Sequence, residues 1–113
     1  MQPENSTILS EAECLKIVQF KGCGHVGFLF NNILLSFNKD EFFDFMEVYR
    51  RIDFARYSIM FPDNKKRIVI KTLVKETQFC FTQPEFEIIK QGLIEASIIL
   101  RAKDIIAMSE NGN

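Results

Sequence analysis

The stretch from Gly24 to Phe42, GHVGFLFNNILLSFNKDEF, decides the fold because it holds two apolar strands, a turn and the start of a helix. Asn31 and Asn32 separate the strands, and asparagine tolerates the positive φ angles that a two-residue hairpin turn needs. Such a turn creates three facing pairs: Phe30 with Ile33, Phe28 with Leu35, and Val26 with Phe37. Side chains alternate along a strand, so these six residues face one side of the sheet and fix its register.

A helix is expected directly after this hairpin. Asn38 is a favourable N-cap, and Glu41 can accept a hydrogen bond from the cap amide while its charge suits the positive end of the helix dipole. Large apolar residues then recur at helical spacing: Phe42, Phe45, Tyr49 and Ile52. This helix face is predicted to cover the aromatic side of the sheet.

The same unit recurs at a constant offset of 44 residues, as IVIKTLVKETQFCFTQPEF from Ile68 to Phe86. The identities are Lys21, Leu29, Phe37, Glu41 and Phe42, which reappear as Lys65, Leu73, Phe81, Glu85 and Phe86. A fixed offset between similar local patterns indicates an internal repeat. The second copy therefore predicts a turn at Lys75 and Glu76, with three facing pairs: Val74 with Thr77, Thr72 with Phe79, and Ile70 with Phe81.

The second helix begins with the same capping pattern as the first. Thr82 is the expected N-cap, Glu85 reaches back to it, and Pro84 lies early in the helix, where a missing N–H costs nothing. Its core face is predicted from helical spacing: Phe86, Ile89, Leu93 and Ala96.

A third strand is expected before each hairpin, at 14–21 in the first copy and 57–61 in the second. The predicted fold class is α+β, a two-layer, duplicated βββα unit that forms an antiparallel sheet with two helices on one face. We expect a single domain over residues 1–113, made of two tandem repeats at about 13–56 and 57–108. The termini, 1–10 and 109–113, are expected to be flexible.

Composition excludes several functional classes. The 113 residues carry a formal net charge of -1, so no global field attracts nucleic acid or an anionic membrane. No apolar run reaches the roughly 20 residues of a membrane span, and the polar start lacks a signal-peptide pattern. A cytoplasmic location without membrane association is expected. The three cysteines are an odd number, which favours reduced thiols.

Apolar residues remain where the predicted fold has no core to receive them. On the second helix they point away from the core face: Ile98, Ile99, Ala102, Ile105 and Ile106. On the outward face of the sheet they are Leu29, Leu34, Val69 and Leu73. Exposed apolar patches usually mark contact surfaces, so we expect a homodimer or a protein partner. Alternatively, the end of the helix folds back over the loop that contains Phe54, Tyr57 and Met60.

Nucleic-acid binding is a weaker alternative. Lys65, Lys66 and Arg67 can form a basic edge that contacts phosphates. Single-strand binders, however, stack bases on aromatic residues of an open sheet, and here the register places the phenylalanines on the helix-covered side. Nucleic acid is therefore an unlikely partner.

A thiol enzyme or a metal site around Cys23 and His25 is the third hypothesis. Residues two apart share a strand face, which would let the imidazole act as a base for the thiol. No third group is identifiable to orient His25, and His25, Cys23 and Cys80 together lack a fourth zinc ligand. We therefore expect no enzyme activity, no metal and no cofactor.

The segment from Ile17 to Phe42, IVQFKGCGHVGFLFNNILLSFNKDEF, resembles an uncharacterised family of small bacterial domains. In that family a strand ends in a Cys-x-x-Cys-like turn, followed by an apolar hairpin and a Glu-Phe helix start. The first cysteine of that turn falls at Phe20, so Cys23 has no partner from the pattern. The resemblance implies the fold but no reaction. The leading hypothesis is a non-enzymatic, self-associating interaction module.

Overall fold

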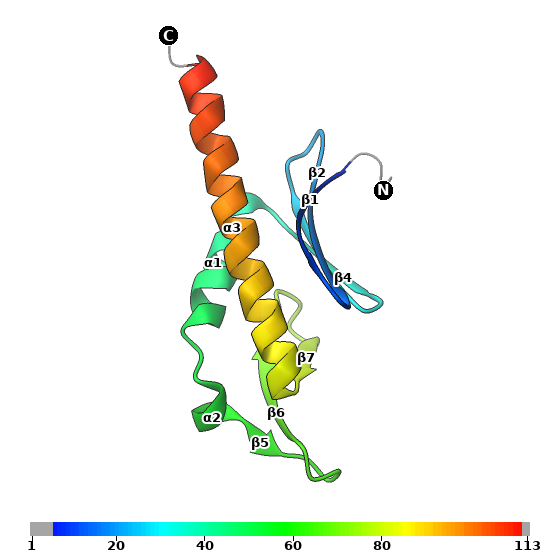
Figure 1. Cartoon of the computed structure of the whole chain (residues 1–113). Coiled ribbons are helices and arrows are strands. Elements are labelled where there is room, and N and C mark those ends of the chain that lie inside the picture. The colour runs from blue at the N-terminus through cyan, green and yellow to red at the C-terminus, as the bar shows by residue number, and fades with distance from the viewer. Residues whose placement is uncertain (1–5, 112–113) are drawn as a thin grey trace.

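A computed structural model describes residues 6–111 and gives the α+β class expected from the sequence (Figure 1). The first half of the chain forms β1 (Ser6–Ala12), β2 (Leu15–Phe20), β3 (Val26–Phe30), β4 (Ile33–Phe37) and α1 (Lys39–Arg50). The second half forms α2 (Phe54–Tyr57), β5 (Ile59–Met60), β6 (Lys66–Lys71), β7 (Gln78–Phe81) and α3 (Gln83–Asn111). All strand pairs in the described residues are antiparallel.

The first hairpin has the register predicted from its sequence. The facing pairs of β3 and β4 are Val26 with Phe37, Phe28 with Leu35, and Phe30 with Ile33. Asn31 adopts a φ of 56°, the positive value expected for the turn. Val26, Phe28 and Phe37 are buried, so the alternation of side chains explains the pairing.

The second hairpin differs from the prediction by two residues. Ile70 faces Phe79 and Ile68 faces Phe81, whereas a strict copy of the first hairpin would pair Ile70 with Phe81. The Thr72 hydroxyl donates to the carbonyl oxygen of Thr77 at 2.7 Å and closes a longer loop, so β6 ends at Lys71. A shift of two residues keeps the same side chains inward, and the phenylalanines of β7 remain buried.

Both helix starts follow the capping prediction. The backbone N–H of Asn38 donates to the Glu41 carboxylate, and the N–H of Glu41 donates to Asn38 Oδ1, both at 2.8 Å. At α3 the backbone N–H of Thr82 donates to the Glu85 carboxylate at 2.9 Å. The Thr82 hydroxyl donates to the same carboxylate oxygen at 3.0 Å. These contacts fix where each hairpin ends and each helix begins.

The strands form two sheets, where sequence analysis expected one. The first sheet has the order β1-β2-β3-β4 and the second has the order β5-β6-β7. The two hairpins meet through aromatic rings: Phe28 lies 5.6 Å from Phe79, and Phe30 lies 5.1 Å from Phe81, between ring centroids. Side chains in the core thus connect the two hairpins. The strand edges do not continue from one sheet to the other.

The start of the chain also differs from the expectation of a flexible segment at 1–10. Residues 6–12 form β1, which pairs with β2, and Leu9 and Ser10 are buried. The register shifts between Ile8 and Ser10, so consecutive residues turn inward and the period-two pattern of a strand is lost from the sequence. Residues 1–5 and 112–113 lie outside the described residues, and 109–111 are helical.

The helices cover the inner side of the sheets. Figure 1 shows α3 running along the molecule, with the four-stranded sheet on one side and α1 on the other. The predicted core face of α3 is buried: Phe86, Ile89, Leu93 and Ala96. On α1, Phe42 and Tyr49 are buried as expected, Phe45 is half-buried, and Met46 joins the core. Ile52, predicted on the same helix face, is half-buried in the loop after α1.

Candidate interaction surfaces

The inner side of the α3 end is fixed to the body of the protein. Leu100 is buried, and the Lys103 ammonium donates to Gln19 Oε1 of β2 at 2.8 Å. Asp104 forms an ion pair with Lys39 of α1 at 2.6 Å. These contacts orient the helix, so the opposite side of residues 98–108 points to solvent.

This outward side is apolar, and we call residues 98–108 the α3 tail. All five residues predicted from the sequence are exposed: Ile98, Ile99, Ala102, Ile105 and Ile106. The exposed fraction is 61% for Ile98, 66% for Ile105 and 73% for Met108. Every residue from Ile105 to Ser109 is exposed, and α3 extends past the neighbouring elements at its C-terminal end (Figure 1). The helix continues straight and does not fold back over the loop around Tyr57.

A second apolar surface lies between α1, α2, β5 and β6, and we call it the α2 groove. It has a volume of about 450 Å³ and is lined by Ile52, Tyr57, Ile59, Ile68 and Val69. A smaller cleft of about 180 Å³ shares Ile52 and Val69 with it and extends to Val48. The groove is therefore almost entirely apolar.

Several residues of the groove and of the adjoining cleft remain open to solvent. The exposed fraction is 58% for Tyr57 and 55% for Ile59 in the groove, and 66% for Val48 in the cleft. Val69 was predicted as a contact residue from the sequence but these three were not, because they come from α1, α2 and β5 and share no period. A weak signal was available: Val48 lies off the core face of its helix, and Tyr57 and Ile59 are large apolar residues beside a turn.

Basic residues flank this groove in the chain. Arg51 precedes Ile52, and its side chain is 75% exposed beside Glu47 at 3.6 Å. Arg56 lies over the ring of Tyr57, with 5.4 Å from its guanidinium carbon to the ring centroid. Glu47 partly balances the charge of Arg51, whereas Arg56 places a positive charge directly beside the groove residue Tyr57.

The predicted sheet residues do not adjoin the α3 tail. Leu29 and Leu34 face each other on the outward side of β3 and β4, whereas α3 packs on the inward side. The Phe20 ring partly covers this outward side, because a Cβ added to Gly27 would lie 2.7 Å from it. Leu73 lies in the loop after β6 and is exposed. The nine predicted contact residues thus fall on four separate places.

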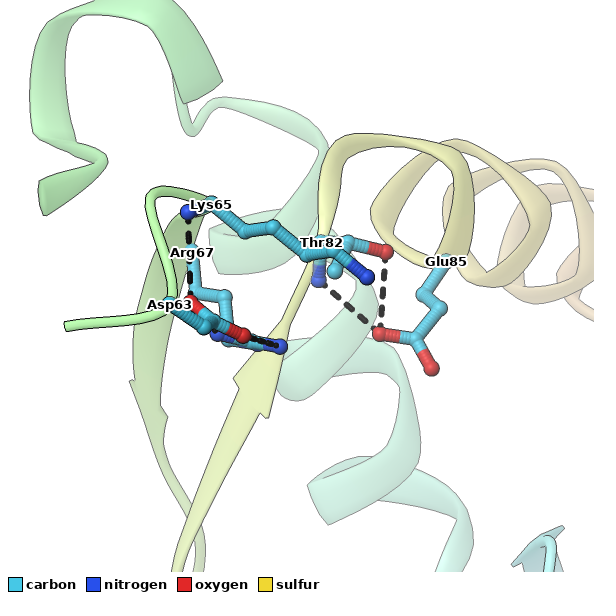
Figure 2. Close-up of polar contacts among 5 residues, drawn as sticks. All are labelled: Asp63, Lys65, Arg67, Thr82 and Glu85. Carbon is cyan, nitrogen blue, oxygen red and sulfur yellow. Dashed lines mark hydrogen bonds and ion pairs between the residues drawn. The ribbon is translucent and has the colours of Figure 1, made fainter. Parts of the chain in front are cut away.

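Within the basic edge predicted at 65–67, Arg67 is paired inside the protein (Figure 2). Arg67 donates two hydrogen bonds to the Asp63 carboxylate, at 3.0 and 2.9 Å, and lies over the Phe61 ring. These hydrogen bonds lower the pKa of Asp63 and raise the pKa of Arg67. Lys65 and Lys66 line an open pocket of about 400 Å³ beside the start of α3.

Cys23 and His25 are both exposed and lie at the turn between β2 and β3. Gly22 and Gly24 make this turn with φ angles of 93° and 72°. Cys14 and Cys80 are also unpaired, and the former is half-buried. Within residues 6–111, no group of three His, Cys, Asp or Glu side chains is arranged to hold a metal ion.

A comparison with protein-family models matches residues 1–110 to DUF6686, a family of unknown function. The chain belongs to this family. The match agrees with the resemblance to an uncharacterised family of small domains that the segment 17–42 indicated. Neither the curated proteins nor the solved structures contain a match. In the part of the chain that the structure describes, no helix is both long and apolar enough to cross a membrane.

Proposed function

We propose that this protein is a non-enzymatic interaction module that self-associates into a homodimer through the α3 tail. The observation that carries the proposal is the exposed apolar side of residues 98–108, which continues beyond the last contacts of the helix with the body. Monomeric proteins rarely leave such contiguous apolar surface uncovered. The three unpaired cysteines fit the reducing cytoplasm, where we place the module.

A partner would also stabilise the last turns of the α3 tail. Short helices without packing are only marginally stable in water, and most helix stability in proteins comes from a packed face. Residues 105–109 have no buried side chain, and β-branched Ile105 and Ile106 have modest helix propensity. Coverage by a second copy would supply the missing packing.

The proposal is tested by measuring molar mass with light scattering at micromolar protein concentration. We expect a dimer for the wild type and a monomer for Ile105→Asp, since a carboxylate cannot be buried in an apolar contact without a large cost. Leu73→Asp is the matched control, because Leu73 is 57% exposed but lies in the loop after β6 and not on the tail, and it should remain dimeric. A monomeric wild type would overturn the proposal.

Nucleic-acid binding through Lys65 and Lys66 is the alternative and draws less support. Arg67 is already paired with Asp63, and Glu85 offsets the positive end of α3 beside these lysines. Binding of labelled single strands that weakens steeply as salt is raised would favour this alternative.

A further inference from the structure

The α3 tail and the α2 groove lie at opposite ends of the molecule. The helix has 29 residues, and at 1.5 Å per residue it is about 44 Å long, in a molecule with a longest dimension of 58 Å. The groove adjoins the beginning of this helix, because Phe54 of α2 packs on Phe86 with 5.6 Å between ring centroids. Figure 1 shows α2 and β5 at the end opposite the C-terminus. The tail cannot reach its own groove.

A second copy removes this restriction. If two copies are related by a two-fold axis with their α3 helices antiparallel, each tail lies beside the end of the partner that carries the groove. This arrangement uses the α3 tail and the α2 groove of each copy. It leaves no free tail that could recruit a third copy, so association stops at the dimer.

The two surfaces have matching chemistry. Ile98, Ala102 and Ile105 lie at i, i+4 and i+7, the spacing with which an amphipathic helix enters an apolar groove. The groove offers Ile52, Ile59 and Val69 and related apolar side chains, without a carboxylate among its lining residues.

Charge also favours this pairing. The C-terminal end of a helix carries a partial negative charge, and α3 has no basic residue in its last turn to offset it. Arg56 is exposed beside the groove residue Tyr57, and Arg51, which pairs with Glu47, precedes the groove residue Ile52. A tail that lies in the groove brings its negative end toward these arginines.

The number of side chains that become covered separates this mode from contact between two tails alone. Contact between tails covers only the exposed tail residues, whereas two tail–groove contacts also cover Tyr57, Ile59 and Val69, which are 58%, 55% and 41% exposed. Burial of apolar surface drives association, so the larger covered area favours the tail–groove mode.

We propose, on the basis of the proposed self-association, that each α3 tail docks in the α2 groove of a second copy, forming a reciprocal two-fold dimer. The partner is thus another copy of this chain. Ile98, Ala102 and Ile105 enter the groove, and Arg51 and Arg56 face the end of the partner's helix.

The test uses one variant on each side of the contact. Ile105→Asp alters the tail and Ile59→Asp alters the groove, and Val74→Asp is a matched control because Val74 is 51% exposed and lines neither groove nor cleft. We expect each of the first two variants to be monomeric where the wild type and the control are dimeric. Val48→Asp, on the exposed side of α1, should weaken the dimer as a second groove variant. Circular dichroism melting verifies that every variant remains folded.

Mixing the two monomeric variants gives the decisive result. An intact tail from Ile59→Asp can enter the intact groove of Ile105→Asp, so an equimolar mixture should form a heterodimer with one of its two contacts. A dimer that forms normally with Ile59→Asp and Val48→Asp, or a mixture that stays monomeric, would overturn the tail–groove contact while self-association stands. A monomeric wild type would overturn both.

Discussion

At the scale of single residues, the core depends on aromatic contacts between segments far apart in the sequence. Tyr49 of α1 illustrates this, because its ring stacks on Phe86 of α3 at 4.7 Å and 15° between planes. Its hydroxyl donates to the Phe86 carbonyl oxygen at 3.0 Å, and the residue is 1% exposed. The capping pair Asn38 and Glu41 was predictable from local sequence, whereas this long-range hydrogen bond has no local signal.

Burial of the phenol makes stability depend on pH in the alkaline range. Burial raises the pKa of Tyr49 well above its usual range, and the nearby charges of Glu87 and Glu85 raise it further. Above about pH 10 the unfolded chain loses this proton while the folded protein keeps it, so the folded state loses stability as pH rises, by at most about 1.4 kcal/mol per pH unit.

Tyr49→Phe tests this linkage. Near neutral pH the variant should be about 1 kcal/mol less stable than the wild type, since it loses one buried hydrogen bond. Above pH 10 the difference should shrink, because phenylalanine has no proton to lose. Urea unfolding at several pH values between 7 and 11 measures the difference, and a gap that stays constant across this range would contradict the assignment.

At the scale of elements, sequence patterns predicted features that depend on neighbouring residues. They missed features that depend on particular side-chain contacts and on backbone irregularities. The first hairpin was predictable because Asn31 and Asn32 mark its turn and the apolar alternation sets its register. The second was predicted two residues out of register, since the Thr72 hydroxyl closes a longer loop. The bulge in β1 interrupts the alternation of side chains, so this strand was not predicted. The two hairpins meet through the rings of Phe28 and Phe30 in two separate sheets, whereas the strand patterns predicted one sheet.

The outward tail residues were predictable, because helical periodicity alone places Ile98, Ile105 and Ile106 opposite the core face. The groove was not, since its lining comes from α2, β5, β6 and the loop after α1, which meet only after folding. Whether a surface is a groove depends on packing, whereas whether a helix side is apolar depends on sequence alone.

Packing of α3 on the first sheet gives a prediction at this scale. Gly92 lies where the helix approaches β2, and a Cβ added there would lie 2.5 Å from Leu15 Cδ2 and 3.4 Å from Ser10 Oγ. Alanine improves helix propensity by about 1 kcal/mol in ordinary contexts, but overpacking costs about 1–3 kcal/mol.

We therefore expect Gly92→Ala to destabilise the protein by roughly 1 kcal/mol net, as measured by urea unfolding. Leu15 is buried, so its side chain has little room to move. The double variant Gly92→Ala with Leu15→Val should recover part of the loss, because the shorter side chain leaves room for the new methyl group. If Gly92→Ala instead stabilised the protein, α3 and the first sheet would be able to move apart at little cost in free energy, which would contradict this expectation.

At the scale of the whole molecule, a long helix joins two apolar surfaces at its two ends. The body holds the helix through Lys39 and Asp104 on one side and Lys103 and Gln19 on the other, which fixes the direction of the helix as far as Asp104. A helix whose direction is already fixed has a lower ordering cost on association. The same helix therefore closes the core near its start and offers a contact surface near its end.

The proposed dimerisation through that helix would link thermal stability to protein concentration. Because two chains unfold from one dimer, a tenfold increase in concentration adds about 1.4 kcal/mol per dimer, or roughly 0.7 kcal/mol per chain. For a chain of this size the melting temperature should then rise by roughly 3–6 °C per tenfold increase. Calorimetry or circular dichroism from 1 to 100 times the lowest usable concentration measures this shift. Ile105→Asp should melt at one temperature throughout, and a wild type whose melting temperature is equally constant would show that its stability does not depend on a second copy.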